Sequence, residues 1–401
     1  MISRRAVLAA AGAAMLPLGS AAAQSAADGT ASPLDSFFKE AEGAVEQQFE
    51  SAATAIDADI ARVEEEMRQV YARFDRELEE VWGAERRLPD KKVWIAYPDG
   101  LETRVIVDYE TGEIRVEVPD SGDAEARIQA MMARMLAADS ELLGSFDEAA
   151  RRLREQLAGE TEVLAPPPAT VPRPATRPAE LGSIVSAAPP SKVERRTLTD
   201  GAGRSKVIAS AKKTFASDYL QQRAQDVRDH VLSNAARFKL PPSLVVSVIH
   251  NESSFNPRAQ SPVPAFGLMQ LVPSSGGRDA YRFVYGDDKS PSPDYLFQPA
   301  ANVELGAAYL HILDTRYLAA VEDPESRLYC VISAYNTGAG NVARAFGTGR
   351  RVKHAAPRIN AMQPAEVFEH LRRNLPYRET QLYIDKVARG MKRYASWDLP
   401  S

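Results

Sequence analysis

The chain has 401 residues, of which 44% are hydrophobic and 26% charged, and its formal net charge is −5. This length and composition are typical of a soluble globular protein with about two domains. Residues 215–401 carry 22 Lys and Arg against 18 Asp and Glu, a surplus too small to indicate a nucleic-acid partner. The single cysteine, Cys330, excludes an intramolecular disulfide.

Residues 1–23 are typical of an export signal, with an apolar segment at 6–18 and an A-x-A cleavage site at 21–23. The two arginines before that segment, Arg4 and Arg5, also resemble a twin-arginine signal, so two export routes stay open. The apolar segment is too short for a stable membrane anchor, and no processed N-terminal cysteine could carry a lipid. We therefore expect a periplasmic protein with a cleaved signal peptide and no lipid anchor.

The pattern of residues 34–160 predicts an α+β N-terminal domain that begins with a long amphipathic helix. From 34 to 82 apolar residues recur every three or four positions, and Met67 and Leu78 belong to an 11-residue repeat that keeps the stripe on one side. Gly43 is a candidate break in this helix. Two interpretations stay open: a spacer or surface for a protein partner, or, as is usual for such a helix, packing on its own domain.

Three short strands are predicted next, at 92–97, 102–109 and 113–118, separated by Pro-Asp-Gly and Glu-Thr-Gly turns. This spacing indicates a β-meander. A second helix is predicted over 124–157, with a methionine-containing apolar stripe that is more typical of a core than of a cofactor site.

The rest of the chain is predicted to be a linker followed by a mostly α domain. Residues 161–191 are proline-rich, which favours extended polyproline II and excludes a packed core, so we expect an interdomain linker. Residues 192–215 could form two strands that join the meander. From 216 to 398 helical patterns follow one another with short Gly- and Pro-marked connections.

Glu252 lies at the end of an apolar helical run that Pro241 and Pro242 begin. Its spacing from Val248 and Ile249 places its carboxyl group on the apolar face, near the negative end of the helix dipole. Both surroundings favour the neutral acid and raise the pKa, as a general acid in glycosidic cleavage requires. The alternative is a structural carboxylate at a fraying helix end, paired with a cation such as Arg258.

The residues around Glu252 decide between these interpretations. "ESSFNPRAQSPVPAFGLMQL" resembles the catalytic signature of the soluble lytic transglycosylases, relatives of goose-type lysozyme, and "ISAYNTGAGNV" and "LYIDKV" resemble two later motifs of that family. The similarity covers about 216–396 and implies a lysozyme-like catalytic domain. The order of the domains resembles the membrane-bound lytic murein transglycosylase C family, although that family is lipid-anchored and this chain lacks the signal cysteine.

The resemblance implies cleavage of peptidoglycan glycan strands at the β-1,4 bond between N-acetylmuramic acid and N-acetylglucosamine. Glu252 is expected to act first as acid and then as base, so that the muramoyl C6 hydroxyl closes on C1 and leaves a 1,6-anhydro end without consuming water. The expected substrate-binding residues are Ser261, Gly267, Met269, Gln270, Tyr335, Asn336 and Tyr383. Gly267 would allow close approach of substrate or backbone, and Met269 would form an apolar floor or fill the core.

No cofactor or metal is expected, because the histidines show no ligand spacing and no second catalytic carboxylate has a comparable motif. Asp279, Asp287, Asp288 and Glu304 each have an ordinary structural explanation. Two alternatives remain: a goose-type lysozyme that uses the same acid with water, and a non-catalytic murein-binding scaffold.

Overall fold

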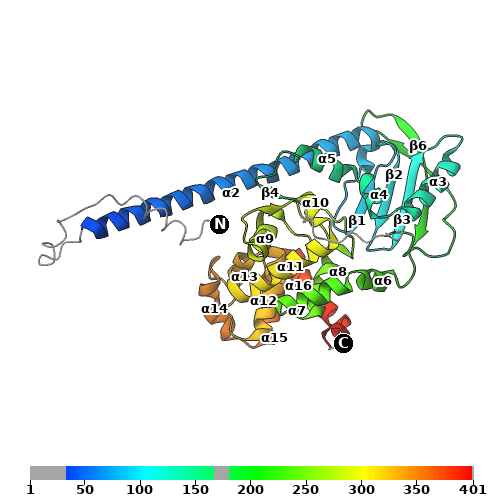
Figure 1. The fold of residues 1–401 in the computed structure, drawn as a ribbon. Helices are drawn as coiled ribbons and strands as arrows, with labels where there is room; N and C mark the ends of the chain where they lie inside the picture. Colours follow the sequence, from blue (N-terminus) through cyan, green and yellow to red (C-terminus); the bar gives the residue numbers. More distant parts are fainter. Residues whose placement is uncertain (1–32, 167–179, 400–401) are drawn as a thin grey trace, which may run out of the picture. The chain divides into compact units, whose positions relative to one another are not determined.

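The computed structural model describes residues 33–166 and 180–399, with side chains from residue 57 onward (Figure 1). The chain divides into two compact units, 1–62 and 63–401. Helix α2, Pro33–Trp82, continues through Gly43 without the break that glycine suggested, and a short turn, Gly83–Glu85, follows it. The N-terminal residues 1–23, where the export signal is expected, lie outside the described residues.

The C-terminal half of α2 is buried along one side. Val63, Met67, Val70, Phe74 and Leu78 are each no more than 3% exposed and belong to one hydrophobic core. Helix α5, Glu148–Gln156, lies in the same core, and an ion pair between Arg152 and Glu77 joins it to α2 at 2.7 Å. In this part of the helix the predicted stripe therefore packs into a core that also contains buried residues of the C-terminal helical domain.

The predicted meander is present and is extended to five antiparallel strands. Strands β1 (Val93–Ala96), β2 (Arg104–Asp108) and β3 (Glu113–Pro119) are followed in space by β6 (Ser205–Thr214) and β5 (Glu194–Thr199). The two strands expected at 192–215 thus complete the sheet of the first domain. One face of the sheet packs on α3, Ala124–Ala137, through a second core that contains Val105, Val116 and Met135 (Figure 1).

Two expectations for this domain were wrong. Residues 124–157 form three helices, because Asp139 and Asp147 cap α4 (Ser140–Ser145) and α5 through the backbone N–H groups of Leu142 and Ala150. The proline-rich stretch is not unpacked throughout. Leu164–Ala165 forms β4, paired in parallel with β7 (Ser290–Pro291), and Leu181 and Ile184 are buried in the meander core. Residues 167–179 lie outside the described residues.

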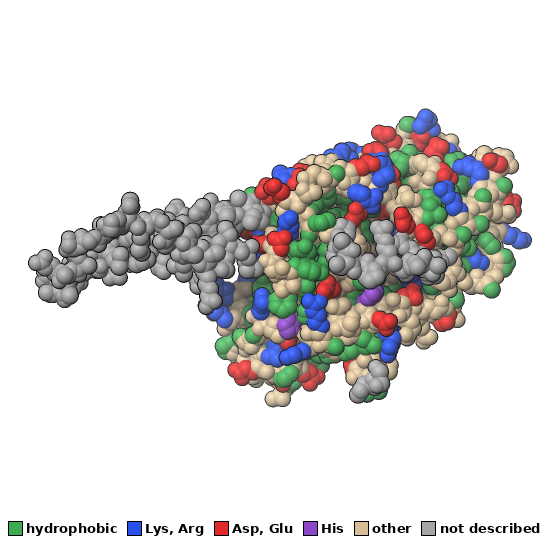
Figure 2. Space-filling model, viewed as in Figure 1, with side chains coloured by type: hydrophobic (Ala, Val, Ile, Leu, Met, Phe, Trp, Pro, Cys, Tyr) green, Lys and Arg blue, Asp and Glu red, His purple; other side chains and the backbone are tan. Residues whose placement is uncertain are grey.

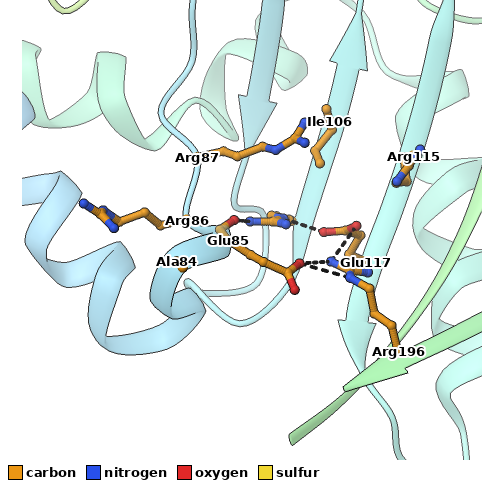
Figure 3. A pocket seen from close by; sticks show the side chains of 9 residues that line it. Ala84, Glu85, Arg86, Arg87, Ile106, Arg115, Glu117 and Arg196 are labelled. Carbon is orange, nitrogen blue, oxygen red and sulfur yellow. Dashed lines mark hydrogen bonds and ion pairs between the residues drawn. The ribbon is translucent and has the colours of Figure 1, made fainter. Parts of the chain in front are cut away.

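A polar cavity of about 280 Å³ opens beside the other face of the sheet (Figure 3). Its floor is a buried ion pair, Arg104 to Glu117 at 2.5 Å, and the Arg104 guanidinium lies 3.8 Å from the centre of the Trp82 ring. Arg196 contacts both Glu117 and Glu85, at 3.1 and 2.9 Å. The two carboxylates of this cavity are therefore paired with Arg104 and Arg196, and these pairs join the end of α2 to the sheet.

The second domain is helical and is built around two helices in contact, α8 (Pro242–Ser253) and α16 (Arg378–Arg393). Helix α8 also contacts α7 (Arg228–Phe238), while α16 contacts α12 (Pro324–Thr337) and α15 (Pro364–Asn374). The remaining elements are α6 (Tyr219–Asp226), Pro273–Gly277, α9 (Arg278–Tyr285), α10 (Pro293–Leu296), α11 (Pro299–Ile312), Leu313–Tyr317, α13 (Ala339–Ala345), α14 (Val352–Asn360) and Ala395–Asp398. The predicted mostly α fold is confirmed.

Surface properties add two observations. On the face seen in Figure 2, basic and acidic side chains are interspersed. Within the described ranges, no helix combines the length and the apolar character needed to cross a bilayer.

Candidate active site

Helix α8 begins at Pro242, as predicted, and is buried on nearly every side. Val246 and Ser247 are as inaccessible as the predicted stripe of Leu244, Val245, Val248 and Ile249, so α8 is a central helix and has no wide solvent face. Glu252 lies in its last turn and is 6% exposed. The carboxyl group is therefore buried because the whole helix is central, a stronger reason than its position on one apolar face.

The backbone around Glu252 is held in uncommon conformations. Four non-glycine residues in the described part of the chain have positive φ, and three of them, Ser254 (50°), Phe255 (64°) and Gln270 (48°), lie in the signature segment that begins at Glu252. Such conformations cost energy and persist only where the surrounding structure enforces them, often at functional sites. Phe255 is fully buried, and its carbonyl accepts a hydrogen bond from Arg223.

The surroundings of Glu252 favour its neutral form. Burial raises its pKa to about 7, and the charge of Lys91, a contact with the Tyr383 hydroxyl and the charge of Lys92 oppose this rise. Glu379 adds to it. Glu252 forms no ion pair with any described residue, and Arg258 instead contacts Ser140 and Glu180. The alternative of a Glu252–Arg258 pair is therefore wrong, and Glu252 can be protonated near neutral pH.

Two tyrosines lie beside Glu252. Burial and the charge of Glu252 raise the pKa of both Tyr383 and Tyr335 well above the usual value. The Tyr335 hydroxyl donates to the carbonyl of Met269 at 2.8 Å, which joins α12 to the Gly267–Gln270 segment. The Tyr383 hydroxyl on α16 is buried and has no hydrogen bond of good geometry. The Tyr383 hydroxyl therefore has the Glu252 carboxyl group as its neighbour and no other hydrogen-bond partner among the described residues.

Three predicted polar residues, Asn336, Gln270 and Ser261, have hydrogen bonds of their own. Asn336 accepts a hydrogen bond from Thr380 at 2.6 Å, and Thr380 is on α16, as is Tyr383. Gln270 donates to the carbonyl of Gly267 at 3.1 Å and is half-buried. The Ser261 hydroxyl donates to the carbonyl of Val263 inside its own loop. The Asn336 side chain is therefore held by α16, and the Gln270 side chain by its own motif segment.

Two predicted residues have a different role in the structure. The Met269 side chain is fully buried against Gly306 of α11, so it fills the core and cannot form the floor of a cleft. Gly267 has φ of 76°, and a Cβ there would lie 2.1 Å from the carbonyl oxygen of Leu296 and 2.3 Å from Asn302 Nδ2. Gly267 is thus required for the approach of backbone and Asn302, and not for that of substrate.

Three of the four other candidate carboxylates are engaged elsewhere. Asp279 accepts from Tyr317, Asp288 pairs with Arg278, and Glu304 contacts Arg237 and Tyr285. Among residues 33–166 and 180–399, no group of three His, Cys, Asp or Glu side chains is placed to hold a metal ion.

Sequence reasoning missed two charged residues near Glu252. Lys91, just before β1, forms an ion pair with Glu379 of α16 at 2.6 Å, and the charges of both act on Glu252. Lys91 and Glu379 are 288 positions apart, and no local pattern brings them together. Glu379 is four residues before Tyr383, so one helical turn of α16 was the only available signal.

Comparison with known proteins agrees with this arrangement. Residues 229–356 match the family described as "Transglycosylase SLT domain", and residues 60–149 match "Membrane-bound lytic murein transglycosylase C, N-terminal domain". The first match includes Glu252, Ser261, Tyr335 and Asn336, whereas Tyr383 lies beyond it.

Whole-chain relatives show the same two-part order. The chain is 32% identical to membrane-bound lytic murein transglycosylase C of Klebsiella pneumoniae over 331 residues, covering 81% of this chain and 88% of that protein. The namesakes from Serratia proteamaculans and Yersinia enterocolitica are 32% and 31% identical, with the same coverage.

A solved structure of lytic transglycosylase Slt from Pseudomonas aeruginosa is 25% identical, covers 42% of this chain and 24% of that one, and has a TM-score of 0.33, too low to support any argument. The family follows from the identity and coverage of the whole-chain relatives. The chain belongs to the membrane-bound lytic murein transglycosylase C family and is a lytic transglycosylase.

Proposed function

We propose that this lytic transglycosylase cleaves the β-1,4 bond between N-acetylmuramic acid and N-acetylglucosamine in peptidoglycan, with Glu252 as the single acid and base. The observation that carries the proposal is a buried, unpaired carboxyl group whose pKa is about 7. Such a group is partly protonated at neutral pH and, once ionised, is a competent base.

The reaction balances with one carboxyl group. Protonated Glu252 donates its proton to the glycosidic oxygen while the bond between muramoyl C1 and that oxygen breaks. The N-acetylglucosamine part leaves with a free 4-hydroxyl. The muramoyl C6 hydroxyl oxygen then forms a bond to C1 and gives its proton to the Glu252 carboxylate. Glu252 ends protonated, no water is consumed, and the product carries a 1,6-anhydro ring.

Neighbouring groups support this sequence without adding charge. The Tyr383 hydroxyl lies next to Glu252, where it can donate a hydrogen bond near the reacting centre. We assign Ser261, Gln270, Asn336 and Tyr335 to binding of sugar hydroxyl and N-acetyl groups or to holding the segments that do so. The nearby carboxylate, Glu379, is neutralised by Lys91 and is 65% exposed, so it is poorly suited to act as a second catalytic acid.

Product analysis tests the proposal. Purified sacculi are digested with the protein, and the soluble muropeptides are identified by mass spectrometry. We expect 1,6-anhydro ends, which weigh one water less than reducing ends. Reducing ends as the main product would establish a goose-type hydrolase instead. No release of soluble material would favour a murein-binding scaffold.

A pH profile gives a further prediction. If Glu252 must be protonated in the free enzyme, kcat/KM falls about tenfold between pH 6 and pH 8, because the acid has a pKa of about 7. The positive charge of Lys91 lowers this pKa, so Lys91→Met moves the alkaline limb to higher pH, and the variant keeps a larger fraction of its pH 6 activity at pH 8.

The control for this profile is Lys353→Met, which removes a lysine of α14 and leaves the limb in place. An unchanged limb in Lys91→Met would show that Lys91 does not act on the catalytic acid.

We also propose that residues 1–23 direct export of the protein to the periplasm, which is the compartment that contains the substrate. The relatives are named membrane-bound, whereas this sequence has no signal cysteine for a lipid. Fractionation of cells that produce the full chain tests this proposal. The mature protein is expected in the periplasmic fraction, and it is not expected to partition into detergent with the membrane proteins.

A further inference from the structure

The loop between α8 and the Gly267–Gln270 segment, residues 254–266, is held by the other domain. The Gln260 side chain is fully buried, and its carboxamide lies between two N-terminal residues. The Tyr71 hydroxyl of α2 donates to Gln260 Oε1 at 2.7 Å. Gln260 Nε2 donates to both carboxylate oxygens of Asp147, at 3.2 Å each.

The N-terminal side of this contact is itself well ordered by hydrogen bonds. Asp147 is 1% exposed and also accepts from Trp94 Nε1 of β1 and from the backbone N–H of Ala150 in α5, both at 2.9 Å. The network Tyr71–Gln260–Asp147–Trp94 thus connects α2, β1 and α5 to one loop residue. A satisfied buried network of this kind is rigid, because the loss of one member leaves another polar group without a partner.

A second contact holds the same loop two residues earlier. The Arg258 guanidinium donates to Ser140 of α4, at 2.9 Å to the hydroxyl, and lies 5.9 Å from the centre of the Trp94 ring. Between the two held residues, the carbonyl of Ala259 accepts the N–H of Gly267 at 2.8 Å. The position of Gly267–Gln270 therefore depends on the part of the loop that the N-terminal domain holds.

Other contacts between the domains have no such link to the signature segment. Arg154 of α5 and Asp294 of α10 form an exposed ion pair at 2.8 Å, and β4 pairs with β7. By contrast, the buried and fully hydrogen-bonded amide of Gln260 lies next to Ser261 in the loop, so its burial points to control of the loop.

We propose that Gln260 is a positioning residue for glycan cleavage, through which Tyr71 and Asp147 of the N-terminal domain hold Ser261 and the Gly267–Gln270 segment in their working geometry. This inference rests on the proposed function of the site. The N-terminal domain is then part of the cleavage apparatus and not only a spacer.

A double-mutant cycle on the full chain tests the proposal. We compare Gln260→Ala, Ser261→Ala and the double variant by kcat and KM on isolated glycan strands. A small displacement of substrate-binding groups costs about 10- to 100-fold in rate, and we expect a loss of this size in kcat/KM for Gln260→Ala. The double variant should be no more than about twofold worse than the poorer single variant, because both changes act through the same group.

A milder variant and a matched control protect the test against loss of folding. Tyr71→Phe removes one hydrogen bond and should lower kcat/KM in the same direction, with faster amide hydrogen exchange confined to 254–266. Asp294→Asn breaks the exposed ion pair between the domains and should leave the rate and the loop exchange unchanged.

Three results would overturn the proposal: losses that multiply in the double variant, wild-type rates in Gln260→Ala and Tyr71→Phe, or an equal loss in Asp294→Asn. All of these are ratios of rates between variants. These ratios can be measured whether the wild type forms anhydro or reducing ends. The identity of the product tests the proposed function separately, so failure of the proposed function can be distinguished from failure of this inference.

Discussion

Glu252→Gln should lower the release of anhydro-muropeptides from sacculi by about 10²- to 10⁴-fold, the usual contribution of general acid–base catalysis. Glutamine has nearly the same shape and can occupy the same buried position, but it can neither give a proton to the glycosidic oxygen nor receive one from the C6 hydroxyl. The effect should appear in kcat, measured as initial rates of soluble product. Substrate binding to sacculi should persist, because the neighbouring hydrogen-bonding groups are retained.

A matched control accompanies this variant. Glu304→Gln removes a carboxylate of the same domain that is held by Arg237 and Tyr285, and it should keep wild-type activity. Full activity in Glu252→Gln would show that another group is the acid. No activity in either the wild type or the variant would favour the scaffold interpretation.

The pH dependence of stability is a separate test of the raised pKa of Glu252. The pKa of Glu252 is raised from 4.5 to about 7 in the folded protein, so the folded state keeps a proton that the unfolded state has lost. The free energy of unfolding therefore decreases by roughly 3 kcal/mol as the pH rises from about 4.5 through about 7. Glutamine does not ionise, so Glu252→Gln does not lose this stability as the pH rises. Its melting temperature should exceed that of the wild type by more at pH 8 than at pH 5.

Glu117→Gln is expected to destabilise the N-terminal domain by about 3–5 kcal/mol. Arg104 and Glu117 are 2% and 1% exposed, and removal of the carboxylate leaves a buried guanidinium without its charge partner (Figure 3). Arg196 also loses one of its two acidic contacts. Thermal unfolding followed by circular dichroism should show a melting temperature lower by roughly 10 °C.

The double variant Arg104→Met with Glu117→Leu separates pairing from packing. A buried ion pair recovers little more than its desolvation cost, so replacement of both partners by apolar residues should lie within about 2 kcal/mol of the wild type. Arg195→Met, which breaks an exposed pair with Asp120, should change stability by less than about 1 kcal/mol. A single variant as stable as the double one would show that the pair is not isolated from solvent.

Local patterns in the sequence predicted much of the fold. The apolar steps of α2, the alternation in β1 to β3 and the proline at the start of α8 each depend on neighbours within a few residues. The breaks at Asp139 and Asp147 were missed although both are N-cap residues, because the apolar stripe continues across them. The packing of Leu181 and Ile184 was missed because composition describes a segment and not the surface that lies next to it.

The candidate site, like the fold, was predicted only in part from local sequence. Short motifs identified Glu252, Tyr335, Asn336 and Tyr383, and the structure brings Tyr335 and Tyr383 close enough to interact with Glu252. Motifs did not distinguish a side chain that faces substrate from one that fills the core, and the Met269 side chain is in the core. The direction of a side chain depends on its contacts across the fold, here with Gly306 of α11.

The sequence by itself determined the family and the classes of the two domains, and it singled out Glu252 as the proposed acid, because each of these depends on residues close together along the chain. The tertiary structure alone decided what surrounds that acid. Lys91 reaches Glu379, and Tyr71 and Asp147 hold Gln260, across 113 to 288 positions of sequence. The pKa of a buried carboxyl group and the position of a loop depend on charges and hydrogen bonds in space, and only the folded chain places these groups side by side.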